Sequence, residues 1–256
     1  MTSLDAPDRA RVKLRENVLN HLWKRYPQHC VILTDPRTRR AIDVGIDRAA
    51  SHGFHAAAQV RAFVALMVML GSHFDEDPQL PWAGEHLRRG ENASRAEVMA
   101  GLLAETKERL EPVIGRNGEY YRRSLAWVEA RSFDLLVMTY DDTDDGLRTL
   151  LRRLHGRKYE VLGEETVATL IGEARTSARE NGLTTRAGVI VYLTLMFLLG
   201  SAVARDPFHP WVNATLAAEA ERHPADLARR LHSNGIDILR RYTFLRHLMH
   251  SNEMKG

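Results

Sequence analysis

The chain has 256 residues, of which 44% are hydrophobic and 27% are charged, which are the proportions of an ordinary globular protein. Its formal charge is only +3, and such a small excess is not the signature of a nucleic-acid-binding surface. A single cysteine, Cys30, excludes an intrachain disulfide and a cysteine-based metal site, and it is expected to be a buried packing residue.

Helical spacing of apolar residues describes the first part of the chain. Residues 11–26 carry one apolar stripe, which Pro27 ends, and residues 38–52 carry another, which Gly53 ends. Residues 56–70 are apolar on nearly every side. A helix with so thin a polar face is expected to lie buried at the centre of its unit.

A turn follows this central helix at Gly71. Pro78 disfavours a helical conformation at Asp77, so the Asp77 carboxylate is expected to accept hydrogen bonds from nearby backbone N–H groups in an Asx turn. Pro81 suits the first turn of the next helix, and Trp82 is expected to cover the entry of that helix. The unit is completed by predicted helices over residues 83–88 and 95–114.

The same turn occurs twice in the chain. Residues 63–82 and 192–211 share the pattern L-M-x-x-L-G-S-x-x-x-x-D-P-x-x-P-W without a gap, at an offset of 129 residues (200 − 71 = 129). The shared positions are mostly apolar, Gly, Pro or Trp, whereas most charged positions differ. We therefore predict a shared structural scaffold rather than two copies of one catalytic site. The second copy supplies Gly200, Asp206, Pro207, Pro210 and Trp211.

Residues 119–140 have no counterpart in the repeat and are predicted to form one long linking helix. An acidic run at 141–145 ends it and is expected to cap the following helix. Because no β alternation is present, the chain is predicted to be all-α, with two homologous helical bundles packed about a pseudo-twofold axis. The expected divisions are a first unit (1–118), a linking helix with an acidic linker (119–146) and a second unit (147–256).

Residues expected to contact a partner lie where the two copies diverge in charge. An acidic group follows the first central helix, and a basic group lies near the start of the second unit. Pairing of these charges within the chain stays open as an alternative to a partner contact. The candidates are Asp75, Glu76, Arg148, Arg152, Arg153 and Arg157.

Common catalytic and metal-binding patterns are absent. The sequence has no HExxH, calcium-loop, Walker or G-x-S-x-G pattern, so no metal and no cofactor are predicted. The longest apolar run, 189–199, is far shorter than the roughly 20 residues that a membrane-spanning helix needs. Together with the lone cysteine, this favours the reducing cytoplasm.

The repeated motif resembles that of a family of small bacterial helical proteins associated with type VI secretion effector gene clusters. That family's pattern is Y-x-x-L-M-F-x-L-G-x-x-F-D-x-D-P-x-x-P-W-A. The resemblance covers most of each unit, although the second unit has Val203-Ala204 where the family has Phe-Asp. The resemblance implies an accessory, adaptor or immunity role beside a secreted toxin, and it implies no known chemistry.

We therefore expect a non-catalytic protein-binding module whose partner is a secreted antibacterial effector, with the chain acting as immunity protein or adaptor. Two alternatives remain. One is an enzyme with a site between the units, around Asp77, Asp206 and the nearby His209. The other is a weak arginine-based nucleic-acid binder, which is less favoured because aromatic residues do not interleave with the arginines.

Overall fold

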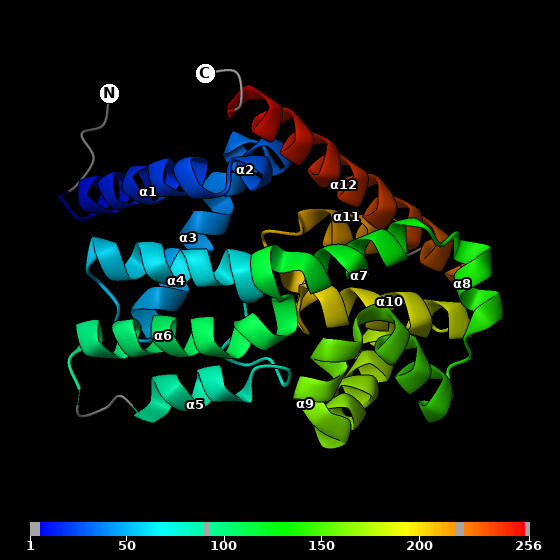
Figure 1. Cartoon of the computed structure of the whole chain (residues 1–256). Coiled ribbons are helices and arrows are strands. Elements are labelled where there is room, and N and C mark those ends of the chain that lie inside the picture. The colour runs from blue at the N-terminus through cyan, green and yellow to red at the C-terminus, as the bar shows by residue number, and fades with distance from the viewer. Residues whose placement is uncertain (1–5, 90–92, 219–222, 254–256) are drawn as a thin grey trace.

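In the computed structural model of the protein, the described residues, 6–89, 93–218 and 223–253, form helices and contain no strand, which confirms the all-α class (Figure 1). The helices of the first half are α1 (Ala6–Arg25), α2 (Pro27–Leu33), α3 (Asp35–Ser51), α4 (Ala57–Leu70), α5 (Pro81–Arg89) and α6 (Arg95–Ile114).

The second half follows the plan of the first. The bounds of α10 and α11 lie 129 residues after those of α4 and α5, and α12 begins 129 residues after α6. The remaining helices are α7 (Glu119–Glu129), α8 (Phe133–Thr139), α9 (Asp144–Glu180), α10 (Arg186–Leu199), α11 (Pro210–Ala218) and α12 (Pro224–Glu253).

Two breaks inside α9 follow the same offset. His155 (φ −156°, ψ 79°) lies 129 residues after Tyr26 (φ −135°, ψ 50°), which separates α1 from α2. Gly163 (φ 76°, ψ 167°) lies 129 residues after Thr34 (φ 71°, ψ 156°), which separates α2 from α3. The single helix α9 thus bends at the two positions where the first half starts a new helix.

Each half has its own hydrophobic core. The first is built from residues between Val18 and Leu102, and the second from residues between Phe133 and Leu231. The apolar helices α4 and α10 lie at the centre of these cores, where Phe63 and Phe197 are fully buried. Burial of such a side chain contributes roughly 1.5–3 kcal/mol, and this explains why these two helices tolerate so few polar residues.

The prediction of one linking helix over 119–140 is wrong, because α7 and α8 are separate helices. Ser132 starts α8 as its N-cap, since its hydroxyl accepts a hydrogen bond from the Leu135 N–H at 3.2 Å. The guanidinium of Arg131 turns back over the ring of Trp127, 3.6 Å from its centroid. Part of the predicted linker also belongs to the second core, to which it contributes Phe133, Leu136 and Tyr140.

The last helix of each half reaches the other half. In Figure 1, α12 runs from the second half back to α2, with which it is in contact. In the same way α6 of the first half contacts α9 of the second. Helix α7 lies between the halves and contacts α6, α9 and α12. The two halves are therefore joined by crossing helices as well as by the chain that links them.

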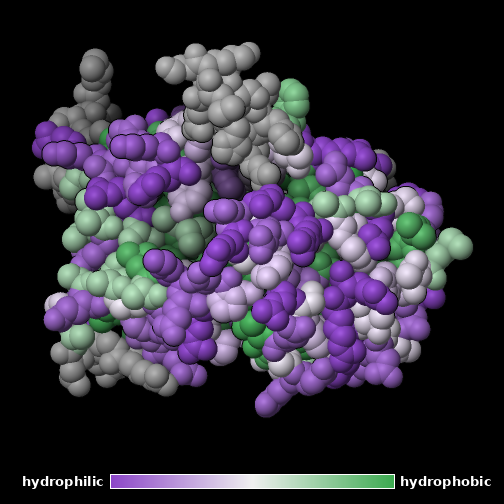
Figure 2. All heavy atoms as spheres, in the orientation of Figure 1, coloured by the Kyte–Doolittle hydropathy of each residue, from purple (hydrophilic) through white to green (hydrophobic). Residues whose placement is uncertain are grey.

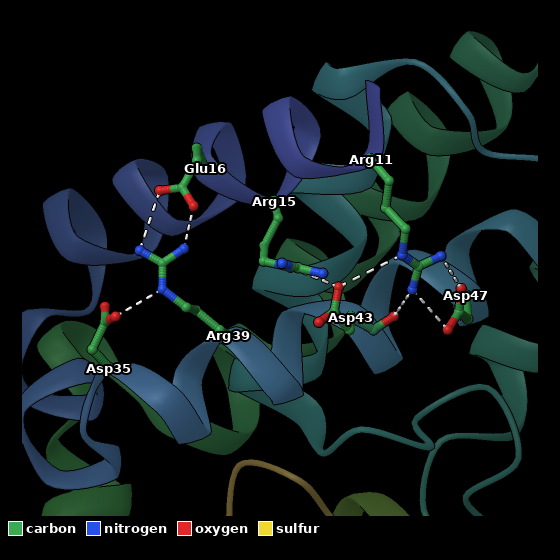
Figure 3. Close-up of polar contacts among 7 residues, drawn as sticks. All are labelled: Arg11, Arg15, Glu16, Asp35, Arg39, Asp43 and Asp47. Atoms are coloured by element: carbon green, nitrogen blue, oxygen red, sulfur yellow. Dashed lines mark hydrogen bonds and ion pairs between the residues drawn. The ribbon is translucent and has the colours of Figure 1, made fainter. Parts of the chain in front are cut away.

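Charged side chains join α1 to α3 on the surface of the first half (Figure 3). Exposed ion pairs contribute about 0–1 kcal/mol each, so this group orients α1 more than it stabilises the fold. The pairs are Arg11–Asp47 (2.6 Å), Arg15–Asp43 (2.8 Å), Arg39–Asp35 (2.7 Å) and Arg39–Glu16.

Candidate functional site

The two repeated turns meet at the junction between the halves. The C-terminal ends of α4 and α10 abut at Gly71 (φ 97°) and Gly200 (φ 108°). A Cβ atom on Gly71 would lie 2.8 Å from the carbonyl oxygen of Leu199, and one on Gly200 would lie 3.4 Å from that of Leu70. Glycine is needed at both positions because of the positive φ and because the two backbones approach so closely.

Asp77 and Asp206 cross-connect the two turns. Each carboxylate accepts a hydrogen bond within its own turn, Asp77 from the Gln79 N–H at 2.9 Å and Asp206 from the Phe208 N–H at 2.8 Å. Each also accepts one from the opposite half. The Ser201 N–H donates to Asp77 at 2.8 Å, and the Ser72 N–H donates to Asp206 at 2.9 Å. The two buried aspartates therefore hold both turns together by equivalent bonds.

Other side chains of the turns also cross the junction. Gln79 donates to the Met196 carbonyl of α10 at 3.0 Å, and Phe208 is buried in the core of the first half. Glu76 lies 3.6 Å from Arg205, which is its equivalent at the 129-residue offset. Positions that contact their own equivalents lie close to a local twofold axis, so the axis of this junction passes between the two turns.

The prolines and tryptophans of the motif shape the turns. Pro81 and Pro210 are the first residues of α5 and α11. Trp82 and Trp211 are partly buried, and each packs against the core of its own half. Pro78 and Pro207 follow the two aspartates and are also partly buried.

The acidic candidates for partner contact are used within the chain. Burial by itself would raise the pKa of Asp75, but hydrogen bonds from His52 (2.7 Å) and Arg48 (2.5 Å) bring that pKa down to about 2. The Asp75 side chain is only 6% exposed. Glu76 is more exposed, at 57%, and it also lies 3.3 Å from Arg48. Asp75 therefore ties α3 to the turn after α4.

The basic candidates lie at the surface and share glutamates. Arg148 and Arg152 both bond to Glu164, at 3.2 and 2.8 Å, and Arg157 bonds to Glu160 at 2.9 Å. Arg152, Arg153 and Arg157 are exposed. This pairing is the internal role that the sequence left open, although the paired glutamates come after the arginines and not from the acidic run before them.

A cavity of about 530 Å³ lies at the same junction. Its wall is mostly apolar and takes residues from both halves and from α7. Figure 2 shows a hollow with hydrophobic side chains in its floor, in the region where Figure 1 places α2, α4, α7 and α12. The volume falls within the roughly 300–1,000 Å³ of sites for small molecules. Helix α7, which has no counterpart in the repeat, supplies Tyr121, Leu125, Trp127 and Val128.

Many wall residues come in pairs that are 129 positions apart. The cavity therefore lies along the axis that relates the two turns, and each half supplies a similar side of the wall. At one pair the chemistry differs strongly, because His29 stands in the first half where Lys158 stands in the second. Examples of such pairs are Leu70 and Leu199, Trp82 and Trp211, Leu110 and Leu239, and His29 and Lys158.

Lys158 and His155 form one polar part of the wall. The Lys158 Nζ donates to the Phe197 carbonyl and lies 4.8 Å from the centroid of the Phe197 ring. Burial lowers the pKa of Lys158 to about 8, although the charge of Asp77 opposes that shift. Burial, together with the Lys158 charge, lowers the pKa of His155 to about 4.

A second polar part of the wall contains His29, His209 and Tyr242. The rings of His29 and Tyr242 are 4.8 Å apart. Burial, assisted by the neighbouring His209, lowers the pKa of His29 to about 4. Burial also lowers the pKa of His209, although Asp206 opposes that shift. Both histidines are therefore neutral near pH 7, and Lys158 is the group in these two parts of the wall that carries charge.

Polar groups without a partner are concentrated around this cavity. Within the described part of the chain, six buried side-chain nitrogen or oxygen atoms lack a hydrogen-bond partner, and five of them belong to wall residues. Buried polar atoms are rarely left unpaired, so this grouping indicates that the cavity is where their partners are supplied. The five atoms are His29 Nδ1, Gln79 Oε1, His155 Nε2, Trp211 Nε1 and His232 Nε2.

The sequence placed the motif residues correctly at one feature but missed the cavity. Lys158 was read only as the end of a basic stretch, and His29 and His155 were not singled out. The available signal was the 129-residue offset itself, which pairs His29 with Lys158 one turn after aligned helix starts. Such a pairing shows that two positions are equivalent, but it does not show that they face one cavity.

No protein-family model, no curated protein and no solved structure matches the chain. Among the helices of the described residues, none combines the length and the apolar character needed to cross a membrane. Within the same residues, no three His, Cys, Asp or Glu side chains are grouped as a metal ion would require.

Proposed function

We propose that the protein is a non-catalytic binding protein, made of two copies of one helical unit, whose ligand is a small and largely apolar molecule held in the cavity at the junction. The observation that carries the proposal is the junction cavity itself, which is apolar over most of its wall and is bordered by five unpaired buried polar atoms. An apolar pocket with a few polar groups is the usual form of a small-molecule site.

The duplication part of the proposal rests on geometry that repeats at one offset. Helix bounds, two backbone breaks and the cross-connecting bonds of Asp77 and Asp206 all recur 129 residues apart. Two copies joined about an axis leave a space between them wherever their faces do not match. Helix α7 lies along that space, so we propose that it covers the cavity.

A catalytic role for Asp77 and Asp206 is less well supported than binding. Both carboxylates already accept two backbone N–H bonds each, and these bonds join the turns. A general acid or base must exchange protons with a substrate, and a carboxylate held by fixed N–H donors is poorly suited to that task.

The test is saturable binding of a neutral apolar probe. Nile red titrated into the protein should bind with a stoichiometry of one per chain, with the blue-shifted emission typical of an apolar site, and 1-decanol should displace it. Leu125→Trp, on α7, places extra bulk in the cavity and should abolish binding. Leu103→Trp is the matched control, because Leu103 is 42% exposed on α6 and is not part of the wall.

Circular dichroism spectra and melting curves of both variants show whether each has folded. If the wild-type protein gives only non-saturable probe fluorescence, or if Leu103→Trp and Leu125→Trp weaken binding equally while folded, the cavity is not a ligand site and the proposal fails.

Recognition of a protein partner, such as a secreted effector bound by an immunity protein or adaptor, is a second proposal. It is favoured by the exposed arginines Arg152, Arg153 and Arg157 on α9. Electrostatic contacts of this kind would set the on-rate and specificity of such a complex. Co-purification from the native host of wild-type protein and of the double variant Arg152→Glu/Arg153→Glu tests it, since the variant should lose the partner while it keeps its melting temperature.

A further inference from the structure

We infer that the ligand of the cavity is an amphipathic carboxylic acid whose carboxylate pairs with Lys158 and whose apolar part lies along α7 and α10. This inference rests on the function proposed above, because it names the class of molecule that the same cavity binds.

The ammonium group of Lys158 has more hydrogen-bond capacity than its neighbours use. An ammonium has three N–H donors, and one of them goes to the Phe197 carbonyl. Within the described residues, no carboxylate lies within ion-pair distance of the Lys158 Nζ. Asp77 is the acidic group whose charge reaches Lys158, but its two oxygens are occupied by the Gln79 and Ser201 N–H groups. Two N–H donors of Lys158 therefore stay available on the cavity wall.

The surroundings of Lys158 favour a counter-charge. A buried charge is costly unless it is paired, and the lowered pKa of Lys158 expresses that cost. The charged and titratable groups that act on it are Asp77, which belongs to the turn after α4, and His155, which precedes Lys158 in α9. His155 is neutral, and Asp77 is already bonded to backbone N–H groups. An anion delivered by the ligand is the remaining way to pair the ammonium.

His155 supplies a second donor in the same part of the wall. Its Nδ1 accepts a hydrogen bond from the Lys158 N–H at 3.2 Å, so in the neutral ring the proton is on Nε2. The Nε2–H has no partner within the described residues. A carboxylate has two oxygens and accepts several hydrogen bonds, so an ammonium and an imidazole N–H together suit one carboxylate.

The single cation also decides which anion fits. A phosphate monoester carries about −1.5 to −2 charges at pH 7, and one ammonium leaves part of that charge uncompensated in an apolar cavity. A carboxylate carries one charge, which one ammonium balances. The rest of the ligand meets Leu125, Val128 and Leu195, so an alkyl or other hydrocarbon body matches this wall.

The experiment compares decanoic acid with 1-decanol, which have the same chain and differ in the head group. We expect decanoate to bind wild-type protein about ten- to a hundredfold more tightly than 1-decanol, which is the range of a hydrogen-bonded charge pair. Lys158→Met should remove that preference and leave 1-decanol affinity unchanged, because methionine keeps the apolar stem. Lys107→Met is the matched control, since Lys107 is exposed on α6 and should keep the preference.

Proton uptake gives a readout that packing alone does not move. At a pH near the lowered pKa of Lys158, about 8, roughly half of the lysines are neutral, and pairing with a carboxylate restores the proton. Calorimetry in buffers of different ionisation enthalpy should therefore detect the uptake of about half a proton with decanoate, and none with 1-decanol. This measurement uses the wild-type protein, so it decides the point even if Lys158→Met does not fold.

The outcomes separate this inference from the proposed function. If decanoate and 1-decanol bind equally and no proton is taken up, the carboxylate assignment is overturned while the apolar site stands. If Lys158→Met folds and keeps the preference, Lys158 is not the pairing group. If neither molecule binds and Nile red does not bind either, the proposed function itself is wrong.

Discussion

Replacement of Asp77 by alanine tests whether the junction is held by the bonds described above. The change removes the acceptor of two buried N–H groups, those of Gln79 (2.9 Å) and Ser201 (2.8 Å). The first bond shapes the turn of the first half, and the second holds the start of the opposite turn. Asp77 is only 4% exposed, so little water reaches the space that it leaves.

The magnitude follows from the unsatisfied donors. A buried N–H left without an acceptor costs about 1–3 kcal/mol, so two of them give about 2–6 kcal/mol, and partial relaxation of the turn brings the expected loss to the lower half of that range. Asp206→Ala should cost a similar amount, because it removes the equivalent bonds from Phe208 and Ser72. The double variant should lose less than the sum, since both residues support one junction.

Urea unfolding followed by far-ultraviolet circular dichroism measures these free energies of unfolding. Asp134→Ala is the control, because Asp134 is 63% exposed and bonds only to Arg229 across the surface. Its loss should not exceed about 1 kcal/mol. If Asp77→Ala and Asp134→Ala lose the same small amount, or if the losses from Asp77→Ala and Asp206→Ala add in full, the two turns are not held by these bonds and the junction geometry is wrong.

Three further predictions concern single features of the fold. Gly71→Ala should destabilise by more than about 2 kcal/mol, because it combines a positive φ with a 2.8 Å approach to a backbone oxygen, whereas Gly172→Ala, with open space around its Cβ, should stabilise by about 0.5–1 kcal/mol; urea unfolding compares the two. Burial lowers the pKa of His29 and of His155 to about 4, so the unfolded chain takes up protons that the folded chain does not. The urea midpoint should therefore fall as the pH drops from about 6.5 to about 4, and less steeply in His29→Leu/His155→Leu; equal slopes would contradict the assigned burial. Burial, assisted by the nearby Asp35 carboxylate, raises the pKa of the Cys30 thiol to about 11, so dithionitrobenzoate should react with it only after urea unfolds the chain.

Local features of the fold were readable from the sequence because the signals are local. The apolar runs that became α4 and α10, and the glycines that end them, need only the residues within each segment to be recognised. The break between α7 and α8 was missed because the apolar spacing continues through it, while the cause is one Ser132 cap. A cap is a single hydrogen bond, and apolar periodicity does not detect it.

The sequence by itself determined the helical class, the two turns with their Asx bonds and the places where proline or glycine starts or ends a helix. Only the tertiary structure decided that each aspartate reaches the opposite turn, that Asp75 is spent inside its own half, and that Lys158 faces a cavity shared by both halves. The physical reason is one of distance. Backbone preferences act over a few residues, whereas a cavity or a cross-junction bond depends on how two surfaces pack, and residues more than a hundred positions apart set that arrangement together.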